Sequence, residues 1–403
     1  MTRNARRDVS THRAPTRRET LKYGGVAIAS GLLAGCTGDG DVSESSPEAT
    51  PEDTPESDDE DYTATISPMG EVQFERPPET VFTRLTHHAD MAFALGRGDG
   101  ITALHAPDYY DGLWNQFVER LPSVSLDWSG LYSSWEPDKE TLYELDSDVH
   151  LADPAWVTRH DSWSRSDIEE IGDNIGPWFG NSLSDRHQDP PEWVTDYEYY
   201  GLWEQFELVA EAFRERERYR ELAAIHDELL ADIEAGLPAD ADRPRTIMIA
   251  AMDLETVYAY TLSNPGFLTA HTRPLNPQDA FEGEVESGSI VDNETLLEAD
   301  PEVILFLGGF EPETDLSEMR ENFESDSVTA EIEAVKNDRI YPQGARYQGP
   351  ILNLFQLEMT AKQLYPEAFG EWPRYEEGPY PEIPEDEQLF DRQRVADAIN
   401  GEF

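Results

Sequence analysis

The sequence has few basic residues and almost no cysteine. Its 403 residues include 84 Asp and Glu but only 30 Lys and Arg, so the formal net charge is −54. Binding to nucleic acid requires a basic surface that neutralises phosphates, so nucleic acid is excluded as an expected partner. The single cysteine, Cys36, excludes an intrachain disulfide and a thiol catalyst elsewhere in the chain. With 38% hydrophobic residues the chain can still fold, and an acidic surface of this strength is typical of a halophilic protein, because high salt screens the repulsion.

Residues 1–36 have the features of a targeting segment rather than of the fold. Thr16–Lys22 contains twin arginines, and the apolar stretch Tyr23–Leu33 is too short to span a bilayer. The segment ends in Leu33-Ala-Gly-Cys36 and resembles a twin-arginine signal with a lipobox. That resemblance implies cleavage before Cys36, lipid attachment to its sulfur, and a protein anchored outside the cell at the outer face of the membrane. An uncleaved anchor or a free cysteine is the alternative.

The remaining chain divides into a spacer, two lobes, a connector and an extension. Eleven acids and no Lys or Arg make residues 37–61 a predicted disordered spacer. Alternating strand and helix patterns predict an N-terminal α/β lobe and a C-terminal α/β lobe, joined by a helix. An acidic extension follows the second lobe, and its last residues have the pattern of a helix. The predicted ranges are 62–200 for the first lobe, 201–237 for the helix, 238–370 for the second lobe and 371–403 for the extension.

The connector is the longest helical pattern in the sequence. Apolar residues follow a spacing of three and four through most of Gly201–Leu237, and no Pro or interior Gly interrupts them before Gly236. The pattern predicts one rigid helix of roughly 50 Å, with the charged run Arg214–Arg218 facing solvent. We take a continuous helix and two separate sheets as the two requirements of a two-lobed carrier.

A partial repeat supports two lobes of related plan. Glu140–Leu151 aligns without gaps with Glu294–Leu305, and seven of the twelve positions are identical. Each copy has the pattern of a short helix followed directly by a buried strand. The repeat therefore predicts two Rossmann-like α/β lobes joined by the long helix, with a ligand cleft between them.

Five segments carry a resemblance to a known family. Ser289–Phe306, Asn337–Tyr341 and Pro350–Phe369 look like the C-terminal half of the iron-siderophore and cobalamin substrate-binding proteins of ABC importers. Val72–Val81 and Ala89–Gly96 are similar to the first strand and helix of that family. The resemblance implies a binding protein without enzymatic activity or a resident cofactor. It implies a monomer that holds an iron chelate, corrinoid or haem between its lobes and delivers it to an ABC permease.

The candidate ligand-binding residues follow from this expected cleft. Arg346 and Tyr347 lie in a loop between Gly344 and Gly349, where the backbone can approach a ligand and an arginine can pair with anionic oxygens. Six of the nine Trp lie between positions 114 and 178, and we expect some of them to fill the core and others to line the cleft. The remaining candidates, chosen by loop position or by aromatic character, are His88, Tyr109, Trp135, Trp178 and Tyr260.

Two other functions remain open at this point. The histidines of the first lobe could bind bare Zn²⁺ or Mn²⁺ for an importer, although no HxH or HxxxH pair occurs among His87, His88, His105, His150 and His160. Paired carboxylates could serve a secreted acid-base hydrolase, but no nucleophile elbow, phosphate loop or HExxH motif is present.

Overall fold

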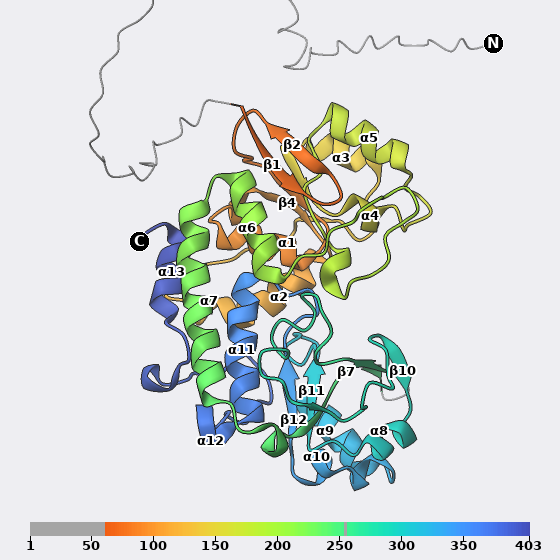
Figure 1. The fold of residues 1–403 in the computed structure, drawn as a ribbon, viewed down its shortest axis with the longest axis vertical. Helices are drawn as coiled ribbons and strands as arrows, with labels where there is room; N and C mark the ends of the chain where they lie inside the picture. Colours follow the sequence, from red (N-terminus) through yellow and green to blue (C-terminus); the bar gives the residue numbers. More distant parts are fainter. Residues whose placement is uncertain (1–60, 254–255) are drawn as a thin grey trace, which may run out of the picture. The chain divides into compact units, whose positions relative to one another are not determined.

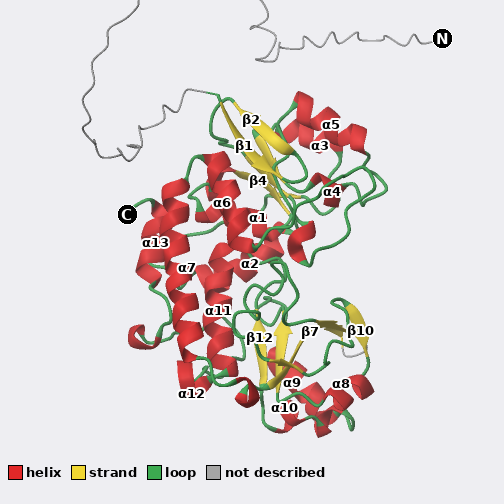
Figure 2. Ribbon diagram, viewed as in Figure 1, coloured by secondary structure: helices red, strands yellow, loops and turns green. Residues whose placement is uncertain are grey.

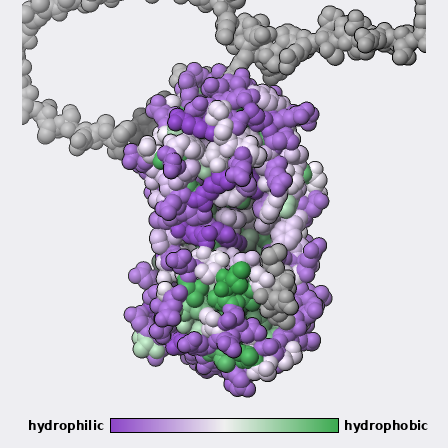
Figure 3. Space-filling view, turned by 90° about the vertical axis from the view of Figure 1, so that its right-hand side faces the viewer, coloured by the Kyte–Doolittle hydropathy of each residue, from purple (hydrophilic) through white to green (hydrophobic). Residues whose placement is uncertain are grey.

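A computed structural model of the protein describes residues 61–253 and 256–403. They form two α/β lobes on separate sheets, flanked by long helices (Figures 1 and 2). The expected signal, Cys36 and nearly all of the expected spacer lie outside the described residues. No helix in the described ranges is long and apolar enough to cross a bilayer. In the view of Figure 3 the surface is mainly hydrophilic, and apolar residues gather in its lower part.

The N-terminal lobe combines a hairpin with a four-stranded parallel sheet. The hairpin strands β1 and β2 are antiparallel, and the sheet has the order β5-β4-β3-β6. Strands β3 and β6 are buried on both faces, as expected for a parallel sheet covered by helices. The elements are β1 (Tyr62–Ile66), β2 (Gly70–Phe74), β3 (Val81–Thr83), α1 (Thr86–Ala94), β4 (Ile101–Leu104), α2 (Pro107–Val118), β5 (Tyr132–Ser133), α3 (Lys139–Leu145), β6 (Val149–Leu151), α4 (Pro154–Val157), α5 (Arg165–Asn174) and the 3₁₀ helix η3 (Leu183–Asp185).

The C-terminal lobe has a mixed sheet of order β10-β8-β7-β11-β12, with β9 beside β7. Strands β7, β11 and β12 are parallel, and β8 is antiparallel to β7. Tyr258 and Tyr260, the latter a candidate site residue, lie on strand β8. The elements are β7 (Arg245–Asp253), β8 (Thr256–Tyr260), β9 (Gln278–Asp279), β10 (Ser289–Val291), α8 (Asn293–Ala299), β11 (Val303–Leu307), α9 (Leu316–Ser325), α10 (Glu333–Lys336), β12 (Ile340–Gln343), α11 (Pro350–Leu364) and α12 (Pro366–Phe369).

The predicted repeat has the same local structure in both lobes. Helices α3 and α8 begin at Asp138 and Asp292, whose carboxylates each accept the N–H of the threonine three residues later at 2.8 Å. The helices end at Asp146 and Asp300, both in the left-handed region, with φ of 45° and 39°. Strands β6 and β11 follow and pair in parallel with β3 and β7. The prediction of two lobes of related plan is confirmed.

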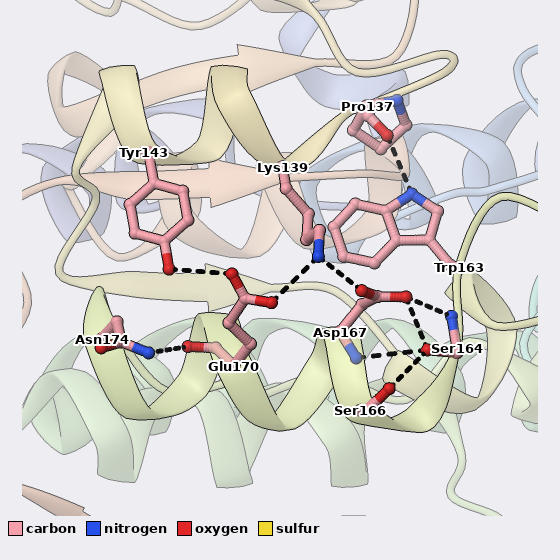
Figure 4. Close-up of polar contacts among 9 residues, drawn as sticks. All are labelled: Pro137, Lys139, Tyr143, Trp163, Ser164, Ser166, Asp167, Glu170 and Asn174. Atoms are coloured by element: carbon pink, nitrogen blue, oxygen red, sulfur yellow. Dashed lines mark hydrogen bonds and ion pairs between the residues drawn. The ribbon is translucent and has the colours of Figure 1, made fainter.

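In the first lobe, one of the four lysines of the chain fixes the repeated helix to α5. The Lys139 ammonium donates to Asp167 at 2.6 Å and to Glu170 at 2.9 Å (Figure 4). Glu170 also accepts from the Tyr143 hydroxyl, and Asp167 closes the capping box at the start of α5 with Ser164. This contact is partly exposed, so its role is to position α3 rather than to add much stability.

The connector is not one helix, and that prediction is wrong. It consists of α6 (Leu202–Phe213) and α7 (Arg216–Gly236), with Arg214 between them at φ 54°. A single residue can adopt this conformation for about 1–2 kcal/mol without being glycine, which the apolar spacing does not reveal. The Arg214 guanidinium lies 4.1 Å from the centre of the Tyr62 ring, and Glu215 pairs with Arg97 and Arg218. The charged run Arg214–Arg218 is therefore a turn between two helices whose side chains form ion pairs and a contact with the Tyr62 ring.

Helix α7, without α6, leads from the first lobe to the second. Glu215, just before its first residue, pairs with Arg97 of the first lobe, and Gly236 at its other end lies against Phe369 of α12. Its 21 residues span roughly 30 Å, and Figure 1 shows it beside α11 and α13 (Arg392–Asn400). The first requirement, a continuous helix over the whole connector, is not met and was too strict, because α7 by itself covers the span between the lobes. The second requirement is confirmed because the two sheets are separate.

The C-terminal extension ends in the expected helix, α13, and ties the two lobes together. Tyr380 donates its N–H to Gln116 of the first lobe at 2.7 Å and its hydroxyl to Glu358 of α11 at 2.7 Å. Glu358 is fully buried and also pairs with Arg392, whose guanidinium lies 3.6 Å from the centre of the Phe390 ring. The Glu358 carboxylate also accepts the N–H of Leu389. It therefore anchors the extension at three residues, Tyr380, Leu389 and Arg392.

We expect Glu358→Gln to lower the free energy of unfolding by about 3–5 kcal/mol, because it leaves the Arg392 charge buried without its partner. Denaturant unfolding in high salt would measure the loss. Glu367→Gln, on the exposed face of α12, is the control and should change stability by less than about 0.5 kcal/mol. Equal stability of the two variants would contradict the anchoring role of Glu358.

Candidate functional site

The loops that follow the strands of both sheets meet at the seam between the lobes. The Thr86 hydroxyl, after β3, donates to the Tyr347 carbonyl, after β12, at 2.7 Å. The Tyr109 hydroxyl, after β4, hydrogen-bonds the Glu311 carboxylate, after β11, and burial with this contact raises the pKa of Tyr109. In α/β proteins, ligands bind beyond the carboxyl ends of the strands, so this seam is the candidate site.

A polar cleft of about 690 Å³ opens along the same seam. Both lobes contribute to it, and the loop at residues 186–189 faces the segments 261–264 and 285–287. Two arginines of the cleft already donate hydrogen bonds to backbone carbonyls. Arg186 donates to the carbonyl of Ser287, and Arg159 donates to the carbonyl of Asp189. The cleft volume suits a small-molecule ligand.

Arg84 is the least satisfied cation of the seam. It lies between β3 and α1 and is only 4% exposed. One terminal nitrogen donates to the Trp135 carbonyl at 2.6 Å, but Nε and the other terminal nitrogen are buried without a partner. No carboxylate of the described residues pairs with it, and burial lowers the pKa of Arg84 to about 10. A buried guanidinium with unpaired nitrogens costs free energy of folding unless an anion binds to it.

Aromatic rings surround this guanidinium. Its centre lies 4.8 Å from the Trp156 ring and 5.9 Å from the Trp135 ring. Trp135 is 56% exposed, and its ring centre lies 4.2 Å from that of His105, with the two rings tilted by 36°. Both ring nitrogens of His105 are buried without partners, and burial beside Arg84 lowers the pKa of His105 to about 3, so it is neutral. N–H donors and flat apolar faces therefore lie side by side around Arg84.

Arg346 lies in the loop after β12 and pairs across the seam with the buried carboxylate of Asp185 in η3. Its guanidinium centre lies 4.7 Å from the Tyr347 ring and 5.9 Å from the Tyr260 ring. Burial lowers the pKa of Arg346, but the interactions with Asp185, Tyr347 and Tyr260 together outweigh it and raise the pKa, so the arginine is charged. Arg346, Tyr347 and Tyr260 thus come together as a group.

None of the seven candidates from the sequence lines the cleft of about 690 Å³, and two of them, Trp178 and His88, are buried inside the first lobe, so their selection as ligand contacts was wrong. Trp178 is 1% exposed, its indole N–H donates to the Ile168 carbonyl at 3.0 Å, and its backbone forms a parallel bridge with His150. Trp178 therefore packs at the edge of the first-lobe sheet, beside β6. Ile340 of β12 has the same position beside Ile304 of β11 in the second lobe. His88 is fully buried and accepts the Asn181 N–H at 3.4 Å, so it orders the loop below the seam.

The structure places the other candidates, Arg346, Tyr347, Tyr260, Tyr109 and Trp135, at the seam, and their contact with a ligand stays a prediction. Sequence reasoning missed Arg84, Asp185 and Glu311. Arg84 had a usable signal, because it lies near the C-terminal end of the strand-like run Thr80–Leu85, where ligands of α/β proteins bind. Asp185 and Glu311 had none, since acids occur everywhere in the sequence.

The histidines do not converge on a common point. His150 bonds the Gly176 carbonyl at 3.0 Å inside the first lobe, whereas the His87 ring lies between His88, at 3.8 Å, and Phe267, at 4.6 Å. Across residues 61–253 and 256–403, no three His, Cys, Asp or Glu side chains gather as metal ligands would.

Comparison with known proteins identifies the fold. Among solved structures, the petrobactin-binding protein YclQ of Bacillus subtilis is similar, with 17% identity over 76% of this chain and 99% of that chain and a TM-score of 0.53. The iron uptake ABC transporter substrate-binding protein PiuA of Streptococcus pneumoniae has 19% identity over 73% and 96%, with a TM-score of 0.51. A periplasmic binding protein of Veillonella parvula has 15% identity over 75% and 97%, with a TM-score of 0.55.

No curated protein matches the chain. The family model described as periplasmic binding protein, however, matches residues 90–347, which is more than half of the sequence. That match covers β4, β5 and β6 of the first lobe, α6, α7 and the sheet of the second lobe, and it ends at the Arg346–Tyr347 loop. The chain belongs to the periplasmic binding protein family.

Proposed function

We propose that this protein captures an anionic ferric chelate outside the cell and delivers it to an ABC permease, acting by binding and release without turnover. The single observation that carries the proposal is Arg84, a buried guanidinium with two unpartnered N–H positions between Trp135 and Trp156 at the seam. The descriptions of YclQ as petrobactin-binding and of PiuA as an iron uptake protein support the same ligand class.

The chemistry of the pocket favours a chelate over the alternatives. A guanidinium fork pairs with carboxylate or catecholate oxygens, and the tryptophan faces accept flat organic groups. A bare Zn²⁺ or Mn²⁺ ion would instead need converging His or carboxylate ligands, which the separated histidines do not provide. A corrinoid or haem also presents carboxylate or amide groups around a flat ring, so both belong in the same screen. The hydrolase alternative is not proposed for a member of a binding-protein family.

The cellular setting is a further part of the proposal. A twin-arginine signal would export the chain, and lipid on Cys36 would anchor it as a monomer at the outer face of the membrane. The charge of −54 suits a halophilic cell, where salt screens repulsion between surface carboxylates. The permease would receive the chelate from a carrier kept near it by the anchor.

Titration of tryptophan fluorescence in high salt would test ligand binding, with ferric catecholates, ferric citrate, ferric hydroxamates, haem and cobalamin as probes. We expect an anionic ferric chelate to bind, and Arg84→Gln to weaken its binding by roughly 100-fold, because one charge-assisted pair is worth about 2–3 kcal/mol.

Arg165→Gln is the matched control for that experiment. Arg165 is an exposed cation of the same lobe that pairs with Glu169 four residues later, so its loss should leave the affinity within a factor of two. If no probe binds to the folded wild-type protein, or if Arg84→Gln binds as tightly as the wild type, the proposed function is contradicted.

Replacing the proposed lipid attachment site should release the protein. We expect Cys36→Ser to move the chain from the membrane fraction to the medium, because the serine cannot carry the thioether-linked lipid. Its thermal unfolding should match that of the wild type, since Cys36 is outside the folded lobes. Fractionation followed by immunoblotting would measure the shift, and a variant that stays with the membrane would contradict lipid anchoring.

A further inference from the structure

The ion pair between Arg346 and Asp185 is incomplete, although both groups are buried. One terminal nitrogen of Arg346 contacts Asp185 Oδ2. The Arg346 Nε and the Asp185 Oδ1 are both buried without a hydrogen-bond partner. A fork of two parallel hydrogen bonds between these groups would satisfy all four atoms. The pairing across the seam is therefore weaker than an arginine and a carboxylate can achieve.

The backbone around Asp185 does not allow the residue to move away as a whole. Its carbonyl accepts the Leu268 N–H at 3.0 Å, and the Ser184 carbonyl accepts the Phe267 N–H at 3.2 Å. Both bonds cross from the first lobe to the second. Among the described residues, the carboxylate has one further hydrogen-bond partner, the Gln188 side chain at 3.5 Å. Exchange at Arg346 thus needs only a rotation of the Asp185 side chain.

We infer that Asp185 determines the charge specificity of ligand binding at the seam: it pairs with Arg346 in the ligand-free protein and yields this arginine to an anionic oxygen of the ligand. This inference rests on the proposed function and adds a second anion-binding position to Arg84. An entering ligand must outcompete the built-in carboxylate. A multiply charged chelate that forms a full fork with Arg346 does so, whereas an uncharged chelate gains nothing from Arg346.

Asp185→Asn tests this competition. The probes are a ferric tris-catecholate, which carries three negative charges, and ferrichrome, an uncharged ferric hydroxamate. Fluorescence titration at 2 M KCl screens long-range attraction, so that only contacts within the cleft matter. We expect Asp185→Asn to bind the catecholate at least about ten-fold more tightly than the wild type does, with any ferrichrome binding unchanged within a factor of two.

Asp189→Asn is the matched control, because it removes the same charge four residues later in the same loop, from an exposed side chain that lines the cleft. Its affinity for the catecholate should stay within a factor of three of the wild-type value. A gain equal to that of Asp185→Asn would mean that net charge, rather than competition for Arg346, controls binding, and the inference would be overturned.

A second pair of variants keeps the test valid if Asp185→Asn does not fold. Arg346→Gln should weaken catecholate binding, and Asp185→Asn combined with Arg346→Gln should bind no better than Arg346→Gln alone. A gain in the double variant would overturn the inference, as would a loss of catecholate affinity in folded Asp185→Asn. Failure of every chelate to bind to the wild type would contradict the proposed function instead, so the two failures are distinguishable.

Discussion

The arrangement of the described chain depends on burying α11 with all of its polar groups paired. Every residue of this helix is buried, and its first free N–H groups, on Ile351 and Leu352, donate to Asp90 of α1 at 3.2 and 3.1 Å. The absence of a side chain at Gly349 lets Asp90 come this close. An unpaired polar group at this depth would cost as much as a lost core contact, so the first lobe is fixed to the second at this helix end.

This constraint also explains why the seam is well placed for a ligand. The loop carrying Arg346 and Tyr347 enters α11 directly, and the loop carrying Arg84 enters α1. Because Asp90 joins these two helices, the two loops face each other at a nearly fixed spacing. In a chain with so few cations, most arginines at the seam are held by carbonyls or carboxylates. The partnerless positions on Arg84 are therefore an informative exception, and the cleft is largely formed before a ligand enters.

The fold was more predictable than the site, for physical reasons. The repeated helix and strand followed directly from the matching residue patterns of the two copies, and the structure has the same elements in both. The break at Arg214 was missed because its stabilising partners, Tyr62, Arg97 and Arg218, come from other parts of the chain or from the next turn. The Arg346 loop was found from its glycines. Trp178 was misplaced because a tryptophan beside a strand end has the same sequence pattern whether it faces the core or solvent.

The C-terminal extension has a consequence for how the molecule is made. Tyr380 bonds α2, and α13 packs against α7 and reaches α1, so the first lobe is completed by residues that follow the second lobe in the sequence. Until the extension has been synthesised, the first lobe therefore lacks part of its own core. Its final packing must wait for residues 371–403, so the two lobes do not complete folding one by one in the order of their synthesis.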